Sequence, residues 1–157
     1  MERLSEGGGA DQYQERLDTF KATFNRTVAF HNSTAFPQLR TWFTDDGRFH
    51  GEFTCQDIHQ GFEGIVHGGV LGSIIDTVMA RCLMGHGFLC MTTTLNLRYH
   101  QPVRTDSLCT FSTWIKSFKI GSIYQLSCTI KQKELLCTSA SGNFIKVKKQ
   151  SRNTAAA

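Results

Sequence analysis

The sequence predicts an α+β domain in which one antiparallel sheet of five or six strands wraps around a single long central helix, with an extra helix at the N-terminus. Two observations support this prediction. An apolar pattern follows His67, runs to Met84 and ends at Gly85, a residue type that closes helices. Residues 90–147 then read as strands separated by turn signals, and a helix with so wide an apolar sector must be buried against a sheet.

The chain before this helix supplies a first helix and a hairpin. Over residues 11–30, large apolar side chains recur at steps of three and four, which is typical of an amphipathic helix: Tyr13, Leu17, Phe20 and Phe24. Residues 41–44 and 47–55 alternate around a turn signal of two acids and a glycine, which predicts a β-hairpin. Gly51 is a candidate for a bulge in the second strand of that hairpin.

Four strands are expected after the long helix, at residues 90–101, 107–117, 122–132 and 135–147, and their spacing predicts an antiparallel meander. The sequence contains no internal repeat, low-complexity segment or change of composition. Residues 1–157 are therefore expected to form a single domain, with a charged tail at about 148–157.

Composition excludes several classes of protein. A hydrophobic fraction of 40% with 19% charged residues is that of a folded protein. The apolar run at residues 64–75 is interrupted by His67 and glycines, so we expect no transmembrane helix and no membrane partner. The N-terminus lacks the apolar core of a signal peptide, which favours a cytoplasmic protein. The net charge of +4 suits an anionic small ligand and is too weak to indicate nucleic acid.

The six cysteines are interpreted as reduced thiols of the core. None belongs to a Cys-x-x-Cys pair and each lies in an apolar stretch, although their even number leaves a disulfide framework open. His50, Cys55 and His59 lie close together in the sequence, but their spacing is not that of a structural zinc site. We therefore expect no bound metal.

The long helix has two unlike faces when each residue is turned by about 100°. One broad sector is apolar and is expected to pack on the sheet: Val70, Leu71, Ile74, Ile75, Val78, Met79 and Cys82. The opposite side is expected to hold Asp76 among small residues: Gly72, Ser73, Thr77 and Ala80. Such a face lets another chain or a ligand approach closely. Asp76 is therefore either a site residue or an ordinary solvated carboxylate.

His67 precedes Asp76 by nine residues, which places the two about half a turn and about 13 Å apart along the helix. The two side chains cannot meet within one chain, so a site that uses both would form across a two-fold dimer. The alternative for His67 is a simple helix cap. Gly68 and Gly69 favour a site, because free N–H groups at a helix start can hold an oxyanion.

These residues carry a resemblance to a known family. The sequence GFEGIVHGGVLGSIID at residues 61–76, followed by MTTTLNLRYHQPV at residues 91–103, resembles the hotdog-fold acyl-CoA thioesterases of the phenylacetyl-CoA type. The resemblance runs from the first hairpin to Val147. It implies a sheet wrapped around the helix, subunits paired side by side into a homodimer, and two active sites that each use both chains. Association of two dimers into a homotetramer is left open.

The resemblance also implies roles for individual residues. Asp76 would be the general base or nucleophile, His67 would position the thioester, and a backbone N–H of Gly68 or Gly69 would polarise its carbonyl. Thr92 would hydrogen-bond the water or the aspartate. The expected substrate-binding residues are Gln60, Gly61, Val66, Ser73 and Thr77, where Gln60 stands for the Asn or Gln that many relatives carry before the histidine. Coenzyme A would be part of the substrate, with no separate cofactor.

Three functions are weighed. Hydrolysis of an acyl-CoA needs a carboxylate and an oxyanion donor, which this pattern supplies. A hotdog dehydratase or hydratase usually sets the acid farther down the helix and lacks the double glycine. A non-catalytic acyl-CoA binding protein differs only in lacking turnover. A serine-histidine-acid triad is disfavoured, because the chain has no Gly-x-Ser-x-Gly turn. The acyl group, and whether CoA or a carrier protein presents it, stay open.

Overall fold

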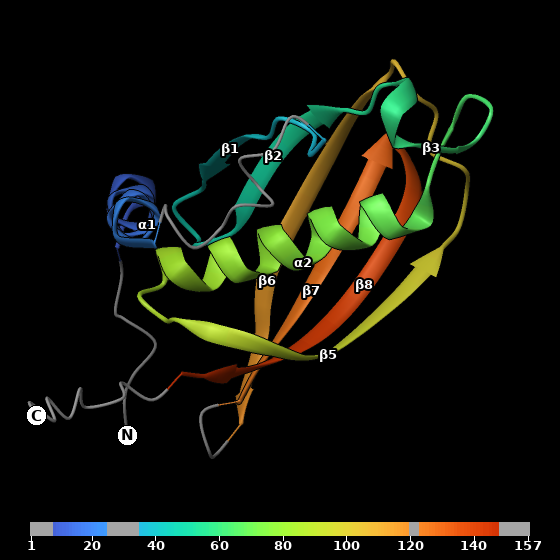
Figure 1. The fold of residues 1–157 in the computed structure, drawn as a ribbon. Coiled ribbons are helices and arrows are strands. Elements are labelled where there is room, and N and C mark those ends of the chain that lie inside the picture. The colour runs from blue at the N-terminus through green and yellow to red at the C-terminus, as the bar shows by residue number, and fades with distance from the viewer. Residues whose placement is uncertain (1–7, 25–34, 120–122, 148–157) are drawn as a thin grey trace, which may run out of the picture.

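The computed structural model describes residues 8–24, 35–119 and 123–147 (Figure 1). Its elements are α1 (Ala10–Phe24), β1 (Arg40–Phe43), β2 (Phe49–Thr54), a short 3-10 helix η1 (Asp57–His59), β3 (Gln60–Phe62), β4 (Ile65–Val66), α2 (Gly68–Gly85), β5 (Cys90–Tyr99), β6 (Leu108–Lys119), β7 (Ile123–Gln132) and β8 (Leu135–Lys146). Of the helix predicted over 11–30, the part after residue 24 lies outside the described residues, as does the predicted tail.

One antiparallel sheet of six strands wraps around α2, which confirms the predicted α+β architecture (Figure 1). The strand order is β1-β2-β6-β7-β8-β5. The predicted four-strand meander is wrong in one respect, because β5 pairs with β8 and not with β6. The connection at residues 100–107 carries the chain past β8 and β7, so β5 becomes an edge strand. Turn signals mark where strands end but not which strand is the neighbour.

The predicted hairpin is present as β1 and β2, and Gly47 takes a positive φ of 77° in its turn. The predicted bulge at Gly51 is absent: the pairing of β2 with both neighbours runs through this residue without a register shift. A Cβ at this position would lie 2.5 Å from the Arg40 carbonyl oxygen and 2.5 Å from the Phe111 ring. The glycine is therefore required by close packing.

Helix α1 packs on α2 and β1, as its apolar spacing predicts. The side chains of Tyr13 and Leu17 are buried, and the Tyr13 ring stacks on Phe43 with 5.4 Å between ring centroids. Among the described residues α2 is the one helix with the length and apolar composition of a membrane-crossing segment. Its residues form the centre of the core in this fold, where Ile74, Ile75 and Met79 are wholly buried.

The two faces of α2 differ from the predicted pair. Gly72 and Thr77 were expected on the open side with Asp76, but both are buried. Strand β5 covers the glycine: a Cβ on Gly72 would lie 3.1 Å from Leu97. The helical wheel alone could not show this, because it has no information on how far the sheet extends around the helix. The open part of α2 is consequently narrower than the sequence indicates.

Candidate active site

The start of α2 presents one open backbone donor. His67 is the N-cap residue, and its Nδ1 accepts a hydrogen bond from the Gly69 N–H at 2.9 Å. Because Nδ1 is an acceptor, the neutral His67 ring carries its proton on Nε2. The side chain of His67 is exposed. Within the described residues the Gly68 N–H has no acceptor. Of the two glycines that the sequence proposed as donors, Gly69 is engaged by His67 and Gly68 is available.

Three contacts fix this helix start in place. The His67 N–H donates to the His59 carbonyl oxygen at 2.9 Å. The Tyr99 hydroxyl at the end of β5 donates to the Gly68 carbonyl oxygen at 2.7 Å. Gly61 leaves room for the histidine ring, because a Cβ there would lie 3.0 Å from His67 Cδ2. The role of Tyr99 could not be predicted from the sequence, since nothing in its local pattern shows that β5 ends beside the helix start.

Asp76 is held by one hydrogen bond from the start of β5. The Thr92 hydroxyl donates to Asp76 Oδ1 at 2.6 Å. Among the described residues no donor is hydrogen-bonded to Oδ2, so the second carboxylate oxygen can accept from water or attack a carbonyl carbon. This geometry leaves one oxygen oriented and the other open.

A β-bulge brings Thr92 to the helix. The pairing of β5 with β8 shifts register between Thr92 and Thr94. In a regular strand, residues 92 and 95 would point to opposite faces of the sheet. With the extra residue, Thr92 contacts Asp76 on α2 while Leu95 also faces the core. A Cβ on Gly142 of β8 would lie 3.4 Å from Leu95 and 3.0 Å from Met79 of α2. Residues 92–94 are all threonine, so the bulge decides that Thr92, and not Thr93, faces the carboxylate.

We predict that Thr92→Val lowers turnover of the acyl-CoA substrate that the sequence resemblance implies by about tenfold or more, because a hydrogen bond to a charged group is lost. Thr92→Ser keeps the hydroxyl and should retain most of the activity. Both variants are compared by kcat after their melting temperatures have been shown to match the wild type. Equal kcat for Thr92→Val and the wild type would contradict an orienting role for this threonine.

The other predicted site residues divide into two groups. The Gln60 Oε1 accepts from the Gly64 N–H at 3.1 Å, and the Ser73 hydroxyl donates to the Gly69 carbonyl oxygen at 2.9 Å. Val66 and Thr77 are 5% and 3% exposed. Their side chains are buried in the single chain, and their assignment as substrate-binding residues stays a prediction. Burial of this kind depends on the packing of β4 and α2 and leaves no mark in the local sequence.

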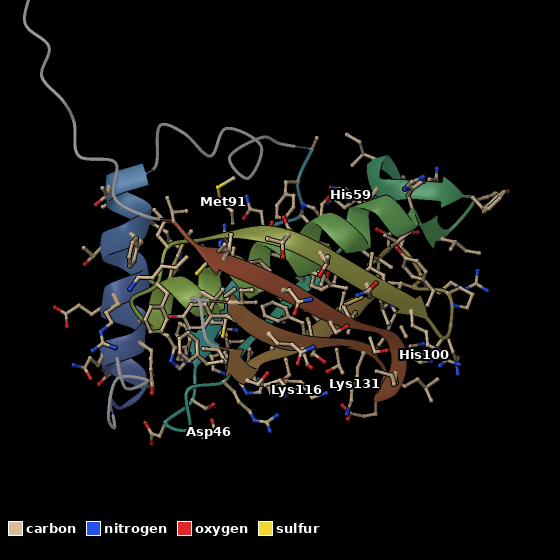
Figure 2. All side chains as sticks on the ribbon, turned by 90° about the horizontal axis from the view of Figure 1, so that it is seen from below. Asp46, His59, Met91, His100, Lys116 and Lys131 are labelled. Atoms are coloured by element: carbon tan, nitrogen blue, oxygen red, sulfur yellow. The ribbon has the colours of Figure 1, made fainter. Side chains whose placement is uncertain are left out.

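Within one chain the two groups of candidate residues are separate. Thr92 lies near the start of β5 and Tyr99 at its end, and seven strand residues correspond to roughly 20 Å. Asp76 is hydrogen-bonded to Thr92, and Gly68 at the start of α2 is hydrogen-bonded to Tyr99. Figure 2 shows the same strand, with Met91 near its start and His100 just beyond its end. Within one chain the two groups of residues therefore lie beside opposite ends of one edge strand.

Buried thiols add no chemistry to this region. All six cysteines are free, and five are buried. Burial raises the pKa of Cys55 to about 11 and that of Cys128 to about 12, so both thiols stay protonated at neutral pH.

Within the described residues no three His, Cys, Asp or Glu side chains are placed to hold a metal ion. Both ring nitrogens of His59 are engaged, by the Gln56 N–H and the Ala35 carbonyl oxygen.

Comparison with known proteins places similar sequences among thioesterases. Residues 63–122, which include His67, Asp76 and Thr92, match the family model described as Thioesterase superfamily. The mouse and rat proteins described as acyl-coenzyme A thioesterase THEM4 are each 32% identical over 90 residues, which cover 56% of this chain and 38% of theirs. The chain therefore spans well under half the length of these curated relatives.

Solved structures show the same architecture. A crystal structure described as a thioesterase superfamily protein is 28% identical with a TM-score of 0.66, covering 69% of this chain and 53% of that chain. The Escherichia coli PaaI protein, from the phenylacetic acid degradation operon, is 12% identical with a TM-score of 0.71, covering 85% and 95%. The fold of this chain is the hotdog fold.

A hypothetical thioesterase from Streptococcus pneumoniae has been solved with coenzyme A. It is 15% identical with a TM-score of 0.66, covering 73% of this chain and 92% of that chain. Structures of the same description carry alanine in place of an aspartate and of a threonine, at positions that differ by sixteen. Asp76 and Thr92 are also sixteen residues apart.

Proposed function

We propose that this chain hydrolyses an acyl-CoA thioester to the free acid and CoA, at a site that Asp76 shares with the helix start of a second copy. The observation that carries the proposal is the Asp76 carboxylate, with one oxygen held by Thr92 at 2.6 Å and the other open. The family match and the THEM4 relatives support the reaction class. The equal spacing of aspartate and threonine in the pneumococcal variants supports the choice of residues.

The chemistry follows from these groups. The open oxygen of Asp76 takes a proton from a water whose oxygen attacks the thioester carbonyl carbon, or attacks that carbon itself to form an anhydride that water then opens. The Gly68 N–H, with the positive end of the α2 dipole behind it, stabilises the negative oxygen that develops. The carbon–sulfur bond then breaks, and the departing thiolate takes up a proton. The Nε2–H of His67 can donate to the thioester or to the leaving sulfur.

A site that combines Asp76 with Gly68 and His67 requires two chains, because these residues lie beside opposite ends of β5 in one chain. The open side of β5 offers the N–H and C=O groups of an edge strand, and Met91 and Tyr99 on this strand are 64% and 50% exposed. Antiparallel pairing of two β5 strands about a two-fold axis would bring the start of one strand beside the end of the other. Asp76 of one subunit would then face Gly68 and His67 of the second.

The substrate class is tested by removing the nucleotide. A panel of short, long and aromatic acyl-CoAs, followed with a thiol reagent, should show turnover for at least one member. For the best acyl group, the matched acyl-pantetheine should have a raised KM at low salt, because CoA phosphates can pair with surface Lys and Arg side chains. Added salt should reduce this difference by screening the exposed pairs.

The panel also separates the alternatives. Binding of acyl-CoA without release of thiol would favour a non-catalytic binding protein, and addition or loss of water along the acyl chain would favour a dehydratase or hydratase. Equal kcat/KM for acyl-CoA and acyl-pantetheine at low salt would contradict recognition of CoA. That result would favour an acyl group presented by a carrier protein.

A further inference from the structure

An open cavity of about 1040 Å³ lies outside the residues proposed for hydrolysis. Its wall is formed by α1, the segment before β1, the two strands of the hairpin, the turn with η1, α2 and the start of β6. Neither Asp76 nor Thr92 lines it, and β5 contributes no residue. Its volume is at the upper end of the range of small-molecule sites.

The lining combines an apolar wall with an excess of positive charge. The apolar side chains are Phe36, Pro37, Leu39, Phe53 and Leu108, and the charged ones are Lys21, Arg40, Arg81 and Glu52. Arg40 Nη1 and Glu52 Oε1 pair at 3.0 Å across the hairpin. Lys21 Nζ pairs with Asp18 Oδ1 at 3.6 Å on a partly exposed part of α1, so Arg81 is left as the positive charge to be accounted for.

Arg81 has no acceptor within the part of the chain that the structure describes. Its side chain leaves the middle of α2 and is partly buried, and burial lowers its pKa. Burial also lowers the pKa of Lys21, and the nearby positive charge of Arg81 lowers it further. A desolvated guanidinium is costly unless an anion pairs with it. Two cations therefore face the cavity: Lys21, which is paired with Asp18, and Arg81, which an anion in the cavity would pair.

We propose that this cavity is a second ligand site, which binds an amphipathic carboxylic acid. The carboxylate would lie between Arg81 and Lys21, and the apolar chain would lie along the wall formed by Phe36, Leu39 and Phe53. A guanidinium matches a carboxylate with two parallel hydrogen bonds, which an isolated lysine cannot do. The free acids that thioester hydrolysis would release belong to this class, but binding here does not depend on hydrolysis.

The test uses octanoate as the probe and calorimetry as the measurement, on the full chain with Asp76→Asn so that turnover plays no part. Arg81→Met keeps the length of the side chain and removes its charge, and Lys21→Met does the same on α1. Lys131→Met is the matched control, because Lys131 is exposed on β7 and lies well away from the cavity residue His59 in Figure 2. We expect octanoate to bind and Arg81→Met to weaken it by about tenfold or more, as for a lost charged hydrogen bond. Lys21→Met should have a smaller effect and Lys131→Met none.

Two comparisons define the ligand. Inorganic phosphate and acetate should bind much more weakly than octanoate, and 1-octanol should bind the wild type and Arg81→Met equally. Equal octanoate affinity for Arg81→Met and Lys131→Met would overturn the proposal, and phosphate binding as tight as octanoate would overturn the amphipathic assignment.

The empty protein gives an independent readout. Because Arg81→Met removes an unpaired, partly buried charge, it should raise the melting temperature by a few degrees without ligand. Octanoate should then raise the melting temperature of the wild type more than that of the variant. A lower melting temperature for Arg81→Met in the absence of ligand would show that its guanidinium is already paired, which would also overturn the proposal. Absence of thioesterase activity would leave each of these results unchanged.

Discussion

Asp76→Asn is expected to lower kcat by about a hundredfold or more while the fold is kept, because asparagine preserves the shape of the side chain but can neither take a proton nor attack as a carboxylate. Its Oδ1 can still accept from the Thr92 hydroxyl, which is 2.6 Å from the carboxylate in the structure. KM should change much less than kcat. The measurement is thiol release from the best acyl-CoA at saturating substrate.

Asp106→Asn is the matched control for this variant. Asp106 lies in the turn before β6 with a positive φ of 56°, a conformation that asparagine adopts readily. The control should therefore keep both turnover and melting temperature. Near wild-type turnover by purified Asp76→Asn would rule out Asp76 as base or nucleophile, whatever the state of the helix start.

Mixing two inactive variants should restore activity if each site uses two chains. In a mixed dimer of His67→Ala and Asp76→Asn subunits, one site combines the intact histidine with the intact aspartate, and the other site has neither. After complete exchange half of the dimers are mixed, so recovery should reach about a quarter of wild-type activity. Subunit exchange is verified by mass-tagged subunits, and the activity is measured before and after exchange.

A second mixture provides the control, in which subunit exchange should lower the activity instead of raising it. Wild-type subunits are exchanged with subunits that carry both His67→Ala and Asp76→Asn. If the site spans two chains, both sites of every mixed dimer are inactive, and activity should fall from about half to about a quarter of that of an all-wild-type sample. If the site lies within one chain, the first mixture recovers nothing and the second loses nothing. That pair of results would contradict the dimeric site.

Local sequence patterns determined most elements of this fold. The steps of three and four place Tyr13 and Leu17 on the buried side of α1, and the apolar run ending at Gly85 gives α2 its length. These predictions succeed because helix and strand periods act over neighbouring residues, where the sequence contains all the information. The proposal of Asp76, His67 and Gly68 as site residues has the same origin, since all three lie on one helix or at its cap.

Tertiary structure decided how these residues meet. The pairing of β5 with β8 makes β5 an edge strand, which no turn signal could show. The register shift beside Thr92 turns that side chain toward Asp76, and the packing of β5 on α2 buries Gly72. Each of these outcomes depends on contacts between segments far apart in the chain. Packing energies depend on several segments together, whereas periodicity can be recognised within one segment.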